Sequence, residues 1–346
     1  MRAGQWAAVS GATILLVAGL AVATLHGPGS AAVRVVEEST TPASPAPTNT
    51  TAPRTPTWRL TSYRKIGYDR SFKADLIDEL PAAPRLVVFG GSRAMRFEPS
   101  YFAEHAGLSA FNCAVQNCRP EDAYAFSSYL FSRAPATRLD CVFAVQTTTF
   151  NDGALHPGLL HDERLSRAFP AALIARQIAA SGKPPVKDLL DTNRFSSRGL
   201  LLRNVYDIGR ERPSYSFDLH MADYLRRTLP KYTWAGRAQT SRSRAYFEKT
   251  MRLYNDHGVV PAIVIMPYHP RALRAFRAVG WQKKVDALMA YLHDAQSRCD
   301  FHVLDLLDIA SFDGRARWFY DGAHVTRENA RLILRYALRA APECFR

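Results

Sequence analysis

The sequence lacks the short motifs by which many nucleotide-binding and metal-binding proteins are identified. It contains no phosphate-cradling glycine-rich loop and no dinucleotide-binding fingerprint. Its cysteines match no zinc-site spacing: Cys113, Cys118, Cys141, Cys299 and Cys344. We therefore expect neither a cofactor nor a metal ion in the functional site. The chain also lacks internal repeats, which argues against solenoid and propeller architectures.

A compact block of basic residues with interleaved aromatic side chains is also missing, although the charge is strongly positive. The 45 Lys and Arg residues outnumber the 31 Asp and Glu residues, giving a formal net charge of +14. The arginines are scattered, whereas a nucleic-acid interface concentrates them on one face or helix. Two explanations stay open: a solvated arginine-rich surface, or attraction to anionic glycans or lipid headgroups. Nucleic acid is not an expected partner.

Charge is absent from one long segment near the N-terminus. Residues 6–25 (WAAVSGATILLVAGLAVATL) contain no charged side chain and have about the length that a bilayer core requires. Arg2 precedes this run and favours a cytoplasmic position for residues 1–5. We predict an uncleaved, single-pass signal-anchor at residues 6–25 in the cell membrane, with the rest of the chain exported. A cleaved signal peptide is the alternative, because alanine-rich residues follow the apolar run.

Residues 26–58 lack hydrophobic periodicity and are rich in Pro, Thr, Ser and Ala. Such a segment cannot bury enough apolar surface to offset its chain entropy. It predicts a flexible linker that holds residues 59–346 off the membrane as an extracytoplasmic domain. In an oxidising location one or two disulfides can form, with Cys299 and Cys344 as a candidate pair. Buried thiols are the equal alternative for Cys113, Cys118 and Cys141.

From about residue 85 the pattern alternates between short apolar strands and amphipathic helices. Strands are expected at residues 85–90, 110–114, 140–146, 259–266 and 301–306. Helices are expected from Pro99, at residues 120–133, and after Thr326, where apolar residues recur at helical spacing: Ala330, Ile333, Leu334 and Ala337. Strands separated by helices predict an α/β fold, a three-layer α/β/α arrangement of flavodoxin-like type with a mostly parallel five-stranded sheet.

Residues 151–236 interrupt this alternation. They predict a largely helical insertion, with its best helix at residues 165–180. Two interpretations stay open: the insertion caps the functional site, or it is an elaboration without substrate contact.

The residues that carry chemistry follow the first and last strands. Gly90-Gly91-Ser92 follows the first strand, and its glycines allow a tight turn that exposes the serine hydroxyl. Asp321-Gly322-Ala323-His324 follows the fifth strand, and an Asp three residues before a His can fold back onto the imidazole. Ligands bind beyond the carboxyl ends of parallel strands, so both segments would face one site. The pattern predicts a triad in which Asp321 orients His324 and His324 activates Ser92.

These two segments resemble the first and last blocks of the SGNH (GDSL-type) hydrolases. VVFGGSRA at residues 87–94 is similar to the GSSR variant of the first block in bacterial envelope members. FYDGAHVT at residues 319–326 resembles the last block, which carries the triad Asp and His. The resemblance extends from about residue 85 to the C-terminus, with residues 151–236 outside it. It implies a three-layer α/β/α fold and carbonyl-ester chemistry through an acyl-serine.

The middle blocks of the family match this chain less closely. NCAVQNCRP at residues 112–120 resembles the second block, in which a glycine N–H contributes to the oxyanion hole; Asn117 stands at that glycine position. TFND at residues 149–152 resembles the third block, which would make Asn151 a side-chain donor, although it lies further from its strand than the family pattern has it. With the backbone N–H of Ser92, the resemblance implies three oxyanion donors. Asn151 as an ordinary loop residue is the alternative.

Other polar residues lie near the predicted site. Arg93, next to Ser92, is expected either to bind an anionic sugar or to form a salt bridge. His269 follows the fourth strand and is expected to line the pocket; a rival triad with His269 as the base has no local Asp. His156 and His161 lie in the insertion beside acidic residues, and we expect polar loop residues there rather than metal ligands.

Together these features predict a membrane-anchored serine esterase or O-acyltransferase on the extracytoplasmic side. The expected substrates are acyl esters of cell-envelope or secreted glycans, or a small acyl ester, and a membrane acyl-donor protein is a candidate partner. Hydrolysis and transfer use the same triad, so the sequence does not distinguish them. The alternative from another class is a non-catalytic glycan-binding or envelope-assembly protein on a degenerate SGNH scaffold, which the imperfect middle blocks suggest.

Overall fold

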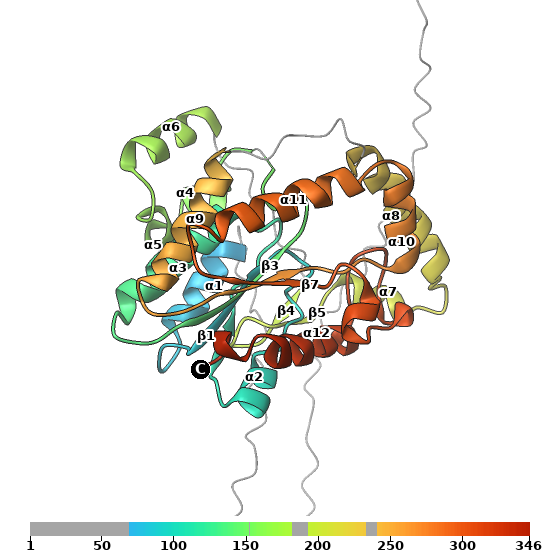
Figure 1. Ribbon diagram of the computed structural model, residues 1–346, viewed down its shortest axis with the longest axis horizontal. Helices are drawn as coiled ribbons and strands as arrows, with labels where there is room; N and C mark the ends of the chain where they lie inside the picture. Colours follow the sequence, from blue (N-terminus) through green and yellow to red (C-terminus); the bar gives the residue numbers. More distant parts are fainter. Residues whose placement is uncertain (1–68, 152, 182–192, 233–240) are drawn as a thin grey trace, which may run out of the picture. The chain divides into compact units, whose positions relative to one another are not determined.

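The described part of the chain comprises residues 69–151, 153–181, 193–232 and 241–346 of a computed structural model (Figure 1). The predicted anchor at residues 6–25 and linker at residues 26–58 lie outside these ranges. Within them, no helix combines the length and the apolar character needed to cross a membrane.

A five-stranded parallel sheet forms the centre of the fold. Its strands are β1 (Leu86–Gly90), β2 (Ala110–Asn112), β3 (Asp140–Val145), β6 (Ala262–Ile265) and β7 (His302–Asp305). Their order in the sheet is β2-β1-β3-β6-β7, so the chain moves first to one side of β1 and then to the other. The five predicted strands and the α/β class are confirmed. The fourth strand starts only after Pro261, which has no N–H to donate to a ladder.

Helices cover both faces of the sheet (Figure 1). One face packs against α1 (Asp69–Asp78), α3 (Pro120–Arg133), α9 (Ser241–Asn255) and α11 (Gln282–Ala295). The other packs against α2 (Pro99–Ala106) and α12 (Arg327–Ala340). Within β1, Val87 and Phe89 face the first layer, while Leu86 and Val88 face the second. Because both faces are covered, the strands are continuous apolar runs in the sequence.

The final helix carries the predicted apolar stripe. All four residues expected to face the core in α12 are fully buried: Ala330, Ile333, Leu334 and Ala337. The remaining elements after β6 are α10 (Pro270–Ala278) and three 3₁₀ helices, η1 (Ile309–Phe312), η2 (Ala316–Trp318) and η3 (Pro342–Cys344).

The insertion is largely helical but differs in detail from its prediction. The helix expected at residues 165–180 is in fact two helices, α5 (Glu163–Ser166) and α6 (Ala171–Ser181). Pro170 lies between them, and proline offers no N–H for a helical hydrogen bond and disfavours helical geometry in the preceding residue. The insertion also contains α4 (Pro157–Leu160), α7 (Val205–Arg210), α8 (Phe217–Tyr232), and an antiparallel pair, β4 (Arg194–Phe195) and β5 (Leu201–Arg203).

All five cysteines lie within the described residues, and each is a buried free thiol. Burial raises the pKa of Cys113 and of Cys344 to about 12, so both thiols stay protonated and unreactive. The structure therefore has buried thiols at Cys113, Cys118 and Cys141, as one alternative predicts, and does not contain the candidate disulfide between Cys299 and Cys344.

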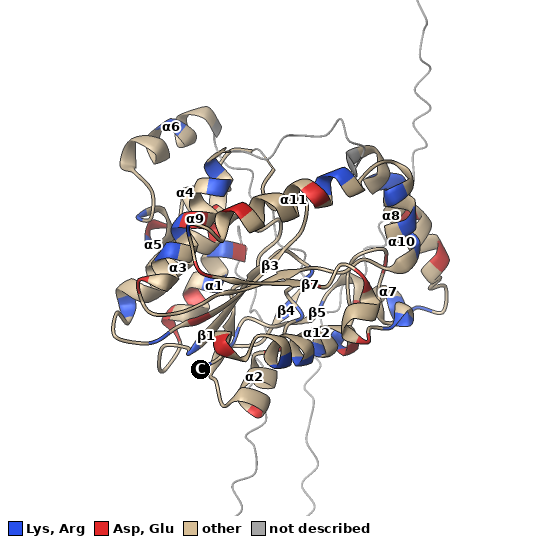
Figure 2. Ribbon diagram, in the orientation of Figure 1, with Lys and Arg blue, Asp and Glu red and all other residues tan. Residues whose placement is uncertain are grey.

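Figure 2 shows basic and acidic residues together on helices such as α9 and α11, whereas α10 and α12 carry mainly arginine. Asp78, for example, pairs with both Arg133 and Arg164, and Glu248 pairs with Arg298 at 3.0 Å. Such exposed pairs are the expected behaviour of a solvated arginine-rich surface, and each contributes little to stability.

Candidate active site

Ser92 lies in a tight turn at the carboxyl end of β1. Gly90 has φ 150°, and a Cβ at this position would lie only 2.7 Å from the Cβ of Ala94, so glycine is required. The fully buried side chain of Asn112 then fixes the turn, because its amide donates to the carbonyls of Ala94 and Phe97, both at 2.9 Å. The half-buried Ser92 is thus held at a defined position.

Asp321 and His324 lie in a second tight turn, between η2 and α12. Phe319 and Val325 pair across it as an isolated antiparallel bridge. Inside the turn, one carboxylate oxygen of Asp321 accepts the backbone N–H groups of Ala323 and His324, both at 2.8 Å. The acidic side chain therefore folds back onto its own turn, as the spacing of the two residues predicts.

The structure brings the three predicted triad residues into one chain of contacts. Ser92 Oγ lies 2.9 Å from His324 Nε2, and His324 Nδ1 lies 2.8 Å from Asp321 Oδ2. Asp321 is 3% exposed; burial alone would raise its pKa, but the adjacent His324 and the hydrogen bonds lower the pKa below the usual 3.8. An ionised carboxylate at Nδ1 keeps the imidazole proton on that nitrogen and leaves Nε2 to accept the serine proton.

A polar cavity of about 420 Å³ lies over the carboxyl ends of β2 and β3. These strands flank β1 in the sheet, and Gln146 in the cavity lining is hydrogen-bonded to Arg93, the residue after Ser92. In doubly wound sheets of this strand order, ligands bind where connections leave neighbouring strands in opposite directions. Asn117, Gln146 and Asn151 contribute to the wall of the cavity.

Asn117 adopts φ 50°, in the left-handed region. Glycine takes this conformation most easily, and Asn is among the few other residues that tolerate it. The turn therefore accommodates Asn at this position, and the role of its N–H as an oxyanion donor stays a prediction.

A buried ion network supports the loop that contains Asn117. Arg70 is 1% exposed and donates two hydrogen bonds to Asp122, at 2.9 and 3.0 Å, and one to Asp69 at 2.9 Å. The second oxygen of Asp69 accepts the backbone N–H of Gln116 at 2.6 Å. The first turn of α1 therefore holds the residue that precedes Asn117.

Asn151 lies in the cavity wall, in a turn that continues from β3. Its backbone N–H donates to the carbonyl of Thr148 at 3.2 Å, and its side chain is half-buried. Its predicted part in the oxyanion hole stays a prediction.

Gln146 is a candidate functional residue that sequence reasoning missed. It directly follows β3, and its Oε1 accepts a hydrogen bond from Arg93 at 3.1 Å. Because arginine can only donate, the amide oxygen must face Arg93 and the NH₂ group must point the other way. A Cβ on Gly91 would lie 4.0 Å from this Nε2, so the NH₂ group faces the turn that leads into Ser92. The available sequence signal was its place as the polar residue that ends the strand predicted at residues 140–146.

We expect Gln146→Glu to lower kcat by about 10²–10³-fold, the usual loss for one oxyanion donor, with little change in KM. The carboxylate keeps its contact with Arg93 but has no N–H to offer the developing charge. Hydrolysis of p-nitrophenyl acetate measures the effect, with Asn151→Ala as the comparison. A larger loss in Asn151→Ala than in Gln146→Glu would identify Asn151 as the donor instead.

Arg93 is buried, at 5% exposure, and its guanidinium joins several loops. Besides Gln146, it donates to the carbonyl of Ala323 at 3.1 Å and to that of Pro267, and it lies 4.1 Å from the ring centroid of Tyr268. Arg93 therefore ties the Ser92 turn to the His324 turn and to the loops after β3 and β6. These contacts make it a positioning residue, and a direct contact with substrate stays a prediction.

His269 forms the N-terminal cap of α10. Its Nδ1 accepts the backbone N–H of Arg271 at 3.1 Å, and its ring packs against Phe217 and Phe319 at centroid distances of 5.1 and 5.6 Å. The side chain is 6% exposed, so the structure places it in the protein interior rather than at an open surface. Burial and nearby arginines lower its pKa from 6.5 to about 4.

Because His269 is neutral in the folded protein, we expect the protein to lose stability in acid. The unfolded chain protonates this residue near pH 6.5 and the folded protein only near pH 4, so between these values the unfolded state binds more protons and stability falls as pH is lowered. His269→Asn keeps a capping oxygen but removes the titration. We expect the urea midpoint to fall less between these two pH values in the variant than in wild type; equal falls would contradict the assignment.

The insertion contributes one wall of the site through two tyrosines. The ring of Tyr206, from α7, lies 4.8 Å from that of His324 with an interplanar angle of 30°. Tyr224, from α8, packs so closely on Gly322 that a Cβ there would overlap the tyrosine ring. Gly322 is therefore required for close approach of the insertion to the turn that carries Asp321 and His324.

His156 and His161, the insertion histidines beside acidic residues, belong to the local turns around α4. His156 lines the cavity, and its Nδ1 accepts the backbone N–H of Gly158 at 3.0 Å, while His161 ends α4. Across the described ranges, no group of three or more His, Cys, Asp or Glu side chains is placed to hold a metal ion.

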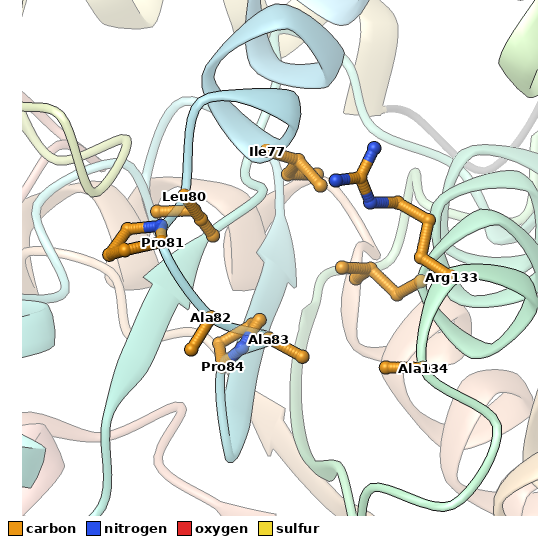
Figure 3. A pocket seen from close by; sticks show the side chains of 9 residues that line it. Ile77, Leu80, Pro81, Ala82, Ala83, Pro84, Arg133 and Ala134 are labelled. Atoms are coloured by element: carbon orange, nitrogen blue, oxygen red, sulfur yellow. The ribbon is translucent and has the colours of Figure 1, made fainter.

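A second cavity, of about 150 Å³, lies at the opposite end of the sheet (Figure 3). It lies between the end of α1 and the end of α3, and Figure 3 shows mainly small apolar side chains around it, among them Ile77 and Pro84. Pro84 precedes β1, whereas Ser92 follows it, so this cavity is separate from the triad residues.

Comparison with protein-family models finds no match to this chain, and comparison with curated proteins finds no relative. The geometry of the site and the resemblance of residues 87–94 and 319–326 to SGNH hydrolase blocks are therefore the grounds for a function.

Proposed function

We propose that this protein is a serine esterase or O-acyltransferase of SGNH type that acts on acyl esters of cell-envelope or secreted glycans. The observation that carries the proposal is the continuous contact from Ser92 Oγ through the His324 ring to the buried Asp321 carboxylate. Three residues from two distant segments meet in the order and at the distances that nucleophilic catalysis requires. The parallel sheet, with helices on both faces, supports the SGNH-like, three-layer part of the proposal.

In the first half-reaction, Ser92 Oγ attacks the ester carbonyl carbon while His324 Nε2 takes the serine proton. Asp321 holds the imidazole in place and stabilises the imidazolium that forms. When the tetrahedral intermediate collapses, the ester C–O bond breaks and His324 gives its proton to the leaving alkoxide. The acyl group is then bound to Ser92 as an ester.

In the second half-reaction, a water molecule or a sugar hydroxyl attacks the acyl-serine and loses its proton to His324. Collapse returns the proton to Ser92 and releases either a carboxylic acid or a new sugar ester. The first outcome is hydrolysis and the second is acyl transfer. Both follow from the same residues, so the acceptor alone decides between them.

The oxyanion of both intermediates needs preorganised N–H donors. We propose the backbone N–H of Ser92, the backbone N–H of Asn117 in its left-handed turn, and the side-chain NH₂ of Gln146, with Asn151 as the alternative to Gln146. The first three belong to loops that leave β1, β2 and β3, which are neighbours in the sheet.

The predicted anchor at residues 6–25 and linker at residues 26–58 remain the basis for a proposed location at the extracytoplasmic face of the cell membrane. A membrane acyl-donor protein is a proposed partner there. A non-catalytic glycan-binding role would not need Ser92 within 2.9 Å of His324, and this distance is the reason we prefer the enzyme.

The proposal is tested with the 346-residue protein in detergent and p-nitrophenyl acetate as acyl donor. We expect nitrophenolate release well above that of heat-denatured protein. Adding xylo-oligosaccharide and analysing it by mass spectrometry shows whether the acetyl group passes to a sugar or to water. Release no faster than with the denatured control would contradict the proposed chemistry.

A further inference from the structure

We propose that a row of aromatic rings, most of them on the insertion, binds the sugar rings of a polymeric glycan beside His324. The aromatic row consists of four side chains: the partly or fully exposed Tyr206, Tyr215 and His220 of the insertion, and Tyr320, which directly precedes Asp321, is 8% exposed and joins Tyr206 to Tyr215. The inference rests on the proposed esterase function and assigns the place where the polymer carrying the ester is held. It concerns residues outside the triad, on α7, on α8, on the segment that joins them and at Tyr320.

The row begins at the proposed catalytic base and leads away from it. Tyr206 lies 4.8 Å from the His324 ring, and Tyr320 lies 5.9 Å from Tyr206 between ring centroids. The hydroxyl of Tyr215 donates to the backbone carbonyl of Tyr320 at 3.4 Å. Tyr215 in turn stacks on His220 at 5.1 Å with an interplanar angle of 27°. Each member therefore contacts the next, from His324 outward to α8.

An exposed guanidinium lies next to the middle of the row. Arg210 is 5.4 Å from the ring centroid of Tyr320 and 5.9 Å from that of Tyr215. Aromatic rings offer a flat apolar face to the C–H groups of a pyranose, and a guanidinium offers several N–H donors to its hydroxyl or carboxylate oxygens. The two kinds of group together match the two kinds of surface that a sugar ring presents.

Two exposed apolar side chains adjoin members of the row in the chain. Among the described residues, the exposed large hydrophobic side chains are Ile178, Val205 and Leu219. Val205 is 42% exposed and adjoins Tyr206 in the chain, and Leu219 is 70% exposed and adjoins His220. Each belongs to the same helix as its neighbour in the row, Val205 to α7 and Leu219 to α8.

The ring of Tyr320, within the row, is held in place before any ligand binds. The hydroxyl of Tyr320 donates to Asp207 at 2.5 Å, and Asp207 also pairs with the buried guanidinium of Arg96. Rings that are already fixed lose little freedom when a ligand packs on them, which favours affinity. A glycan fits a row of successive, fixed rings with a hydrogen-bonding neighbour, whereas a long acyl chain would need a closed aliphatic groove.

The test is affinity electrophoresis of the 346-residue protein in detergent-containing gels with soluble polysaccharide, using xylan, mannan, pectin and alginate in separate gels. We expect at least one of them to retard the wild-type protein. Tyr215→Ala and Arg210→Ala should each weaken that binding by about tenfold, the size of effect seen for aromatic and arginine contacts at binding sites. Tyr215→Phe keeps the ring and should bind like wild type.

Tyr129→Ala is the matched control, because Tyr129 forms a similar pair with Arg133, at 5.7 Å, on α3. It should bind like wild type, and melting curves check that every variant is folded. Ser92→Ala should also bind like wild type, so loss of the proposed catalysis and loss of the aromatic row are separate results. Retardation by none of the four polysaccharides, or unchanged retardation in both Tyr215→Ala and Arg210→Ala, would overturn the inference.

Discussion

Ser92→Ala is expected to reduce hydrolysis of p-nitrophenyl acetate by about 10⁴-fold or more, to the level of the background reaction. The hydroxyl is the proposed nucleophile, and no acyl-enzyme can form without it. The half-buried Ser92 is held by a turn whose contacts come from the backbone and from Asn112, so the substitution should leave the fold intact.

The matched control for this variant is Ser132→Ala, which removes an exposed hydroxyl on α3 that is bonded only to the carbonyl of Tyr129 among the described groups. It should hydrolyse the ester at the wild-type rate, and urea unfolding should give similar midpoints for both variants. Wild-type activity in Ser92→Ala would exclude the proposed triad.

Asp321→Asn is expected to lower kcat by about 10⁴-fold, even though it changes one atom of the side chain. In the native turn one oxygen of Asp321 accepts the N–H groups of Ala323 and His324, and the other faces His324 Nδ1. The amide oxygen of Asn must stay with the two backbone donors, so its NH₂ group would face Nδ1. The imidazole would then carry its proton on Nε2, where it cannot accept the proton of Ser92.

Asp313→Asn provides the control for this exchange. Asp313 is exposed and has φ 60°, a conformation that Asn tolerates well, so the variant should keep full activity. The ring nitrogens of His324 can be followed by NMR, and we expect the proton to move from Nδ1 to Nε2 in Asp321→Asn. A variant that keeps its activity, or keeps the proton on Nδ1, would show that Asp321 does not set the tautomer.

The sequence predicted the sheet well because buried parallel strands are continuous apolar runs, and all five were found near their expected positions. It did not predict α1 (Asp69–Asp78), whose buried residues include Asp69, Arg70 and Lys73. Hydrophobic periodicity cannot reveal a helix that buries charged side chains. Those charges are buried because each has a partner that only the folded chain brings close. These partners are the N–H of Gln116 for Asp69, the carboxylate of Asp122 for Arg70, and the carbonyls of Asn112 and Gly199 for Lys73.

The site was predictable where local turns decide the geometry and less so elsewhere. The fold-back of Asp321 onto His324 follows from residues three apart, and the glycine turn places Ser92 after its strand. Gln146 was missed because its orientation depends on Arg93, which is distant in sequence. The contact of Tyr206 with His324 likewise depends on how the insertion packs. The amphipathic pattern of the insertion predicts helices but does not specify the surface against which they pack.

The most direct test of Ser92 as a nucleophile activated by His324 is mass spectrometry of the protein after treatment with a fluorophosphonate, a reagent that labels activated serines. The contact of Ser92 with His324 predicts one phosphonylated peptide, the one that contains Ser92, with labelling lost in His324→Ala and after heat denaturation. Absence of label on Ser92 in the native protein, or equal labelling of Ser92 in His324→Ala, would contradict the account.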